Sequence, residues 1–195
     1  MKSQNTKLSS TERRSIVDHI EVRSLGSART VYGYALKFNF LSKDLGGFQE
    51  CIDPAALNGV DLSDVVALFN HDKNLILART TSKTLRLTID KVGLRYEFDP
   101  PNTAAGNDLL ISIKRGDVSG SSFQFIVSEN GDSWDLRNGV MVRTILKFSR
   151  IIDVSPVVFP AYNETDIAKR SLDSFKTKYP HRYETMIMID NYRKN

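Results

Sequence analysis

The chain has 195 residues, a net charge of +4, 41% apolar residues and 26% charged residues, which are ordinary values for a globular domain with a sizeable core. No apolar run reaches the roughly 18 residues that a membrane-spanning helix needs, and the first seven residues lack the apolar core of a secretory signal. These features exclude a membrane helix, and we expect a cytosolic protein with no membrane partner.

The cysteine and histidine content predicts neither disulfides nor a metal site. Cys51 is the single cysteine of the sequence and is interpreted as a small buried hydrophobe. The three histidines have no spacing typical of metal ligands, so we expect no metal and no cofactor. Basic residues gather near both ends of the chain without a helix-turn-helix, RNP or zinc-finger pattern. We therefore expect solvated ends and no specific nucleic-acid partner.

Short β-strands dominate the predicted secondary structure. Residues 1–17 lack apolar periodicity, and we expect them to form a flexible N-terminal arm. From Ile20 onward, apolar and polar residues alternate or form apolar runs of strand length. Two Asn-Gly pairs in the second half are strong hairpin signals. The predicted strands cover residues 29–38, 48–52, 65–69, 75–79, 84–89, 93–98, 122–127 and 140–152.

Three segments predict helices. Asp53-Pro54 indicates the start of a short helix, because aspartate caps helices and proline fits the first turn. Residues 107–116 begin with Asn-Asp and end with Lys-Arg-Gly, which is typical of a complete helix. Residues 166–180 are predicted as an amphipathic helix within a basic C-terminal tail, residues 166–195. The predicted domain between arm and tail covers residues 18–165.

These elements predict a mainly β fold of the α+β class. Short polar turns join most strands, so we expect the pairing to be mostly antiparallel. A sheet with this many strands tends to close on itself. The prediction is therefore an antiparallel β-barrel with a few helices.

A cluster of small residues, residues 116–122, precedes the strand at 122–127. A serine at the start of a strand can present its hydroxyl to a substrate, but it needs a base within hydrogen-bond reach. Ser122 is the candidate nucleophile, and Ser119 and Ser121 are its rivals. All three also fit the interpretation of ordinary turn serines.

His71 is the candidate base. It comes two residues after the apolar strand at 65–69, and a strand end can hold a side chain rigidly while leaving it accessible. His19 and His181 lie in poorly patterned end regions. An imidazole with its ordinary pKa of about 6.5 suits proton transfer at neutral pH. A surface-turn histidine is the alternative interpretation.

Asp153 is the candidate orienting group. It interrupts an apolar run, and a buried carboxylate is costly unless it is paired. Pairing with His71 would satisfy the carboxylate and fix the tautomer of the ring. Asp72 is a weaker rival, because neighbouring side chains of a strand point in different directions. A strand-end aspartate without a catalytic role is the alternative.

Four blocks in chain order resemble the prohead protease family of tailed phages. The resemblance runs from about Val31 to Thr165. Two residues depart from the family pattern: Ser121 stands where the family often has methionine, and Gln124 stands where it often has glycine. The blocks are Asn70-His71-Asp72, Arg79-Thr80 with Thr84-Leu85-Arg86-Leu87 and Gly93-Leu94-Arg95-Tyr96-Glu97, Arg115-Gly116-Asp117 with Ser122-Phe123-Gln124-Phe125, and Asp153-Val154-Ser155 with Phe159-Pro160-Ala161-Tyr162.

The resemblance implies roles for particular residues. The family's nucleophile maps to Ser122, its base to His71 and its third, acidic member to Asp153. The family is similar in fold to the herpesvirus assemblins, a likeness that implies a barrel, although assemblins use a second histidine as third member. By that likeness, the donors that bind the oxyanion would lie near Ser149-Arg150.

The resemblance also implies a function. The chain would be a serine endopeptidase that cleaves the scaffolding region of the major capsid protein and itself, inside the assembling prohead in the host cytoplasm. The resemblance also allows two further partners, a second copy of the chain in a homodimer and the portal protein. The alternatives are a non-catalytic β-barrel scaffold that binds the capsid protein, and a nucleic-acid-binding domain that works through its basic ends.

Overall fold

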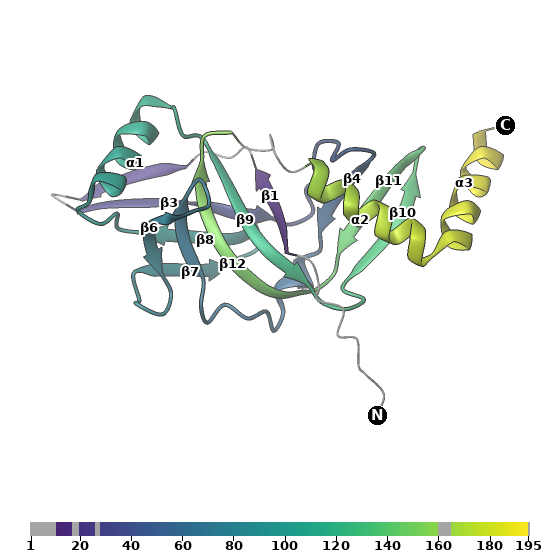
Figure 1. The fold of residues 1–195 in the computed structure, drawn as a ribbon, viewed down its shortest axis with the longest axis horizontal. Helices are drawn as coiled ribbons and strands as arrows, with labels where there is room; N and C mark the ends of the chain where they lie inside the picture. Colours follow the sequence, from purple (N-terminus) through teal and green to yellow (C-terminus); the bar gives the residue numbers. More distant parts are fainter. Residues whose placement is uncertain (1–10, 17–19, 26–27, 160–164, 195) are drawn as a thin grey trace.

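The chain folds into β-sheets with helices at both ends of the molecule (Figure 1). The computed structural model describes residues 11–16, 20–25, 28–159 and 165–194. The long strands β9 and β12 cross the middle of the molecule in Figure 1, and the mainly β character of the prediction is confirmed. The helices are the 3-10 helix η1 (Pro54–Leu57), α1 (Ala104–Arg115), α2 (Thr165–Lys178) and α3 (Pro180–Lys194).

A five-stranded sheet carries Ser122 and Asp153 on its strands and His71 on the turn between two of them. β12 is its central strand and pairs antiparallel with β9 on one side and parallel with β5 on the other. Its strands, in spatial order, are β1 (Glu12–Ile16), β9 (Gly120–Val127), β12 (Phe148–Val157), β5 (Val66–Phe69) and β6 (Asp72–Arg79).

Two smaller sheets flank the central one. The four-stranded sheet is antiparallel, whereas β4 of the three-stranded sheet pairs parallel with β11. The first consists of β2 (Glu21–Leu25), β3 (Ala28–Lys37), β8 (Gly93–Phe98) and β7 (Leu85–Ile89). The second consists of β10 (Asp132–Arg137), β11 (Val140–Ile145) and β4 (Phe48–Ile52).

The predicted antiparallel barrel is not supported. The described strands belong to three separate sheets, and in none of these do the first and last strands pair. Two of the strand pairs are parallel. Alternating residues indicate that a segment is a strand, but closure depends on which strands exchange hydrogen bonds, and alternation carries no information on pairing. The strands β6 and β7 illustrate this, because they follow each other in the chain but lie in different sheets.

Three local predictions also need correction. Residues 12–16 of the predicted flexible arm form strand β1, which pairs with β9. Strand β10 was missed, because Trp134 is its one buried residue and the rest of its sequence is mostly polar. Helix α1 begins at Ala104, where the Thr103 hydroxyl accepts a hydrogen bond from the Gly106 N–H and caps the helix. The predicted glycine stop, Gly116, is confirmed with a φ of 83°.

The amphipathic helix predicted over residues 166–180 is confirmed as α2 (Thr165–Lys178), which covers a hydrophobic cluster beside the three-stranded sheet. Leu172 and Phe175 pack there with Phe48 of β4 and Trp134 of β10. The rings of Phe175 and Trp134 stack with centroids 5.2 Å apart. None of the helices in the described part of the chain combines the length and apolar character that a bilayer crossing requires.

Replacing Phe175 by alanine should lower the free energy of unfolding by about 3–5 kcal/mol, because the change leaves a cavity under Trp134. Urea denaturation followed by tryptophan fluorescence measures this loss. Tyr192→Ala in α3 is the matched control, since Tyr192 is 85% exposed and its loss should change stability by no more than about 0.5 kcal/mol. Equal effects of the two substitutions would contradict a structural role for the α2 cluster.

Candidate active site

His71 lies on a tight turn between β5 and β6. Phe69 pairs with Asp72, so the turn consists of Asn70 and His71. Both residues have left-handed backbones, with φ of 53° and 60°. This is the backbone of a two-residue hairpin turn, and asparagine and histidine tolerate it better than most residues.

Asn70 fixes this turn against the end of β12. Its N–H donates to the carbonyl of Pro156 at 3.0 Å, and its side-chain Oδ1 accepts from the N–H of Val158 at 3.0 Å. The turn is therefore held on both sides of Val157. This anchoring places the His71 ring over β12 and β9.

His71, Ser122 and Asp153 form one unbroken series of contacts. Nδ1 of His71 lies 2.6 Å from Oδ1 of Asp153, and Nε2 lies 2.6 Å from Oγ of Ser122. Because a carboxylate only accepts, Nδ1 carries a proton and Nε2 is left to accept the proton of the serine hydroxyl. The geometry can therefore transfer a proton from the hydroxyl to the ring, beside a negative charge that stabilises the ring once it is protonated.

A β-bulge in β12 brings Asp153 to the Ser122 face of the sheet. Ile151 pairs with Phe125 and Asp153 pairs with Gln124, so Ile152 is an extra residue between them. Without it, the alternation would place Asp153 opposite Phe123, on the core face. Beyond the bulge, Ser155 lies directly opposite Ser122.

Ser155 is a site residue that the sequence prediction missed. Its hydroxyl donates to Oδ1 of Asp153 at 2.9 Å and lies 3.2 Å from Nδ1 of His71. It is fully buried. The signal was present in the sequence, because positions i and i+2 of a strand share a face and Ser155 follows Asp153 by two residues.

The rival residues do not contact this series of side chains. Ser121 is buried on the opposite face of β9, where its hydroxyl bonds to that of Tyr96 at 2.8 Å. Ser119 is exposed in the preceding turn. Asp72 is also exposed, and its Oδ1 accepts from the N–H of Asn74 at 2.8 Å. His181 is exposed on α3 and His19 lies outside the described residues.

The predicted oxyanion donors lie far from Ser122. Arg150 pairs with Ile126, which is four residues along β9 from Ser122, or about 13 Å at the rise of a strand. Ser149 donates to the carbonyl of Ile126 at 3.2 Å. Both residues lie near the start of β12, several residues before Ser155, which is the residue opposite Ser122, so the strand does not bring them to the site.

Strand β1 covers Ser122. Ser15 pairs with Ser122 across the strands, and Oγ of Ser122 lies 3.0 Å from the carbonyl oxygen of Arg14, so the single hydroxyl proton has two acceptors within reach, this oxygen and Nε2 of His71. As a result Ser122 is only 1% exposed. The side chains of His71 and Asp153 are also almost fully buried, at 5% and 4% exposure.

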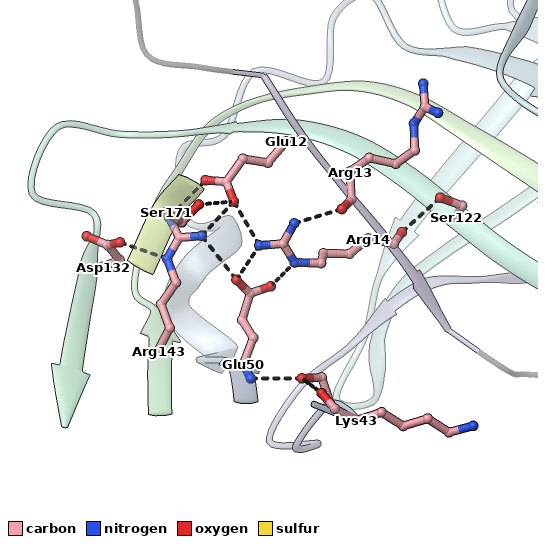
Figure 2. Close-up of polar contacts among 10 residues, drawn as sticks. Glu12, Arg13, Arg14, Lys43, Glu50, Ser122, Asp132, Arg143 and Ser171 are labelled. Carbon is pink, nitrogen blue, oxygen red and sulfur yellow. Dashed lines mark hydrogen bonds and ion pairs between the residues drawn. The ribbon is translucent and has the colours of Figure 1, made fainter. Parts of the chain in front are cut away.

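A buried network of charged side chains continues from β1 into the body of the protein (Figure 2). The Arg14 guanidinium donates from Nη2 to Glu12 at 2.8 Å and to Glu50 at 2.9 Å. Arg143 donates to the same two carboxylates, at 2.6 Å and 3.1 Å from Nη1, and to Asp132 at 2.7 Å. The sequence prediction missed this network, because charges scattered over several strands have no linear pattern.

The network changes the pKa values of its members. Burial acts to raise the pKa of Glu12, but the nearby Arg143 and Arg14 outweigh it, so the pKa is lowered. Burial acts to lower the pKa of Arg14, but Glu50 and Glu12 outweigh it and raise that pKa. Both groups are therefore held in their charged forms.

No group of three or more His, Cys, Asp or Glu side chains within the described ranges is arranged to hold a metal ion. The chemistry that the site offers is that of a hydroxyl, an imidazole and a carboxylate. This is the class of site used by serine hydrolases.

The sequence matches the model of the caudovirus prohead serine protease family over residues 18–178. The chain therefore belongs to this family, as its resemblance predicted. No curated protein matches the chain.

The solved structure of the bacteriophage T4 capsid assembly protease, gp21, has a similar fold. The two structures align with a TM-score of 0.52 over 77% of this chain and 98% of that chain, at 11% sequence identity. At this identity the similarity concerns the fold alone.

Acid should destabilise the protein partly through Glu12. Its folded pKa lies below its unfolded value of about 4.3, so its contribution to stability is complete above that value and is lost as the pH falls through the folded pKa. Glu12→Gln should lower the free energy of unfolding at pH 7 by about 3 kcal/mol, because it removes a negative charge that Arg14 and Arg143 face in the buried network. It should also flatten the fall in stability below about pH 4.3.

Urea denaturation at a series of pH values measures both effects. The control is Asp108→Asn, which changes an exposed carboxylate on α1 and should leave the pH profile close to that of the unchanged protein. A Glu12→Gln profile parallel to that of the unchanged protein would show that Glu12 is not held ionised by its arginine partners.

Proposed function

We propose that the chain is a serine endopeptidase of phage capsid assembly, with Ser122 as nucleophile, His71 as general base and Asp153 as the group that orients the ring. The observation that carries this proposal is the continuous series of contacts from Asp153 through His71 to Ser122, each 2.6 Å long. Membership of the prohead serine protease family supports the same reaction class.

In the proposed reaction the hydroxyl of Ser122 attacks a peptide carbonyl while Nε2 of His71 takes its proton. Asp153 stabilises the charged ring, and His71 then gives the proton to the leaving amine. A water molecule next attacks the acyl-enzyme, again with His71 as base. Ser155 holds Asp153 in position through its hydrogen bond.

The proposed substrates are the scaffolding region of the major capsid protein and the chain itself. The family description places its members in the prohead of caudoviruses, and gp21 is named as a capsid assembly protease. We therefore propose that this chain acts inside the assembling prohead in the host cytoplasm. We also propose that the chain forms a homodimer and contacts the portal protein.

Ser122→Ala should leave the protein folded and lower cleavage of co-expressed capsid precursor by about 10⁴-fold or more, because the nucleophile is lost. Intact mass spectrometry of both chains measures cleavage and locates the cut sites. The control is Ser119→Ala, which removes an exposed hydroxyl three residues away and should leave cleavage unchanged. Retained cleavage by Ser122→Ala would overturn the assignment, and Ser121→Ala would then be tested.

Asp153→Asn should lower kcat by roughly 10⁴-fold with little change in KM, since an amide can hold the ring in the wrong tautomer. Ser155→Ala should have a smaller effect of the same kind. The matched control is Asp72→Asn, because Asp72 adjoins His71 in sequence but bonds to Asn74. Cleavage kinetics on purified capsid precursor distinguish these outcomes, and an equal loss in Asp72→Asn would contradict the role of Asp153.

A further inference from the structure

Strand β1 lies against β9 as an extended peptide lies against a protease. It pairs antiparallel with the strand that carries Ser122, in a register that sets Arg14 opposite Phe123 and Ser15 opposite Ser122. The Arg14 carbonyl oxygen is 3.0 Å from the Ser122 hydroxyl. The carbonyl group of Arg14, and with it the peptide bond between Arg14 and Ser15, therefore lies beside the nucleophile.

We propose that residues 12–16 occupy the substrate-binding groove of the protease, that the chain cuts itself between Arg14 and Ser15, and that Glu50 and Arg143 select substrates with a Glu-x-Arg sequence before the cut. This inference rests on the proposed function of Ser122, His71 and Asp153. It adds the position of self-cleavage and the residues that determine specificity.

Side-chain alternation in β1 supports the selection of Glu-x-Arg. Glu12 and Arg14 share one face of the strand and are 4% and 5% exposed. Arg14 donates to Glu50 at 2.9 Å, and Glu12 accepts from Arg143 at 2.6 Å and 2.9 Å. Figure 2 shows the side chain of Arg13, between them, pointing away from the network.

The charges of the groove match those of the peptide. If β1 leaves, Glu50 and Arg143 remain as neighbours 3.1 Å apart, and each loses a buried partner of opposite charge. A peptide that carries glutamate and arginine two residues apart restores both pairs. A neutral peptide leaves both groups desolvated with one partner fewer, which disfavours its binding.

A cavity lies along β1 at the residues on both sides of the cut. It has a volume of about 470 Å³, and Arg14, Ser15 and Ile16 line it. The exposed apolar side chains of Phe40 and Leu41 line it as well. The residues that follow the cut bond therefore border a partly apolar cavity.

The edge of β9 explains why a strand binds here. One edge of β9 pairs with β12, and the other pairs with β1. Once β1 leaves, that second edge presents unpaired N–H and C=O groups beside Ser122, which is how a sheet edge captures an extended peptide. A second substrate can reach Ser122 only after β1 has been displaced, so removal of β1 opens the site.

The reaction balances with water as the co-reactant. Ser122 Oγ bonds to the Arg14 carbonyl carbon while His71 takes the hydroxyl proton, and the C–N bond to Ser15 breaks as His71 gives that proton to the new amine. Water then attacks the ester, with its proton passing to His71 and back to Ser122. The products are a peptide ending in the carboxylate of Arg14 and a chain that begins at Ser15.

Intact mass spectrometry of the full chain tests the inference. The unchanged protein should accumulate a chain that begins at Ser15, and the Ser122→Ala protein should keep its N-terminus. Because the strand and the groove belong to one chain, the rate should not depend on protein concentration.

Arg14→Gln should slow this cut by at least about tenfold, and Arg14→Lys should slow it less, since it keeps the charge that faces Glu50.

Arg13→Gln is the matched control. It removes the same charge from the neighbouring residue, whose side chain points away from Glu50, and it should leave the rate of the Arg14–Ser15 cut unchanged.

Glu50→Gln should reduce the preference for arginine over glutamine directly before the cut. Synthetic peptides with the sequence of residues 11–16, carrying either arginine or glutamine at the position of Arg14, measure this preference. The Arg14 variants keep the test informative if the Glu50 variant does not fold.

The outcomes separate the two proposals. Ser122-dependent cleavage of capsid precursor without a cut after Arg14, or with equal rates for Arg14→Gln and Arg13→Gln, overturns this inference and leaves the proposed function intact. If neither the chain nor the capsid precursor is cut in a Ser122-dependent way, the proposed function fails and the inference fails with it.

Discussion

The β-bulge at Ile152 is the constraint on which the site depends. It shifts the register between β12 and β9 by one residue, so Asp153 and Ser155 face the same side of the sheet as Ser122. A ladder without the bulge would direct the Asp153 carboxylate at the aromatic core beside Phe123. The register thus decides both where the carboxylate lies and whether His71 finds a partner.

The turn that carries His71 shows how the sheet holds a strained residue. A left-handed conformation at a residue other than glycine costs on the order of 1–3 kcal/mol, and it persists only where neighbouring contacts fix it. Here Asn70 bonds to both Pro156 and Val158 at the end of β12. Strand β12 therefore supplies the carboxylate and also the anchor of the histidine, which ties the two groups to one rigid element.

The buried charges link the site to the N-terminal strand. Burying Glu12, Arg14, Glu50 and Arg143 brings little net stability, because desolvation offsets most of the attraction between them. What such a network provides is selectivity, since a strand that lacks one of the charges leaves its partners unpaired. The same contacts hold the Arg14 carbonyl beside Ser122, so in the self-cleavage that we propose one set of side chains serves both recognition and positioning.

Alternation, turn residues and local caps determined most strands, the helix stop at Gly116 and the amphipathic helix α2, because these features depend on neighbours in the chain. The family resemblance singled out Ser122, His71 and Asp153, which the fold brings within hydrogen-bond distance. Only the tertiary structure decided the open sheets, the pairing of β1 with β9, the place of Ser155 and the Glu12–Arg143 contacts. Each of these rests on hydrogen bonds or ion pairs between distant segments, and a one-residue shift of register reverses which face a side chain occupies.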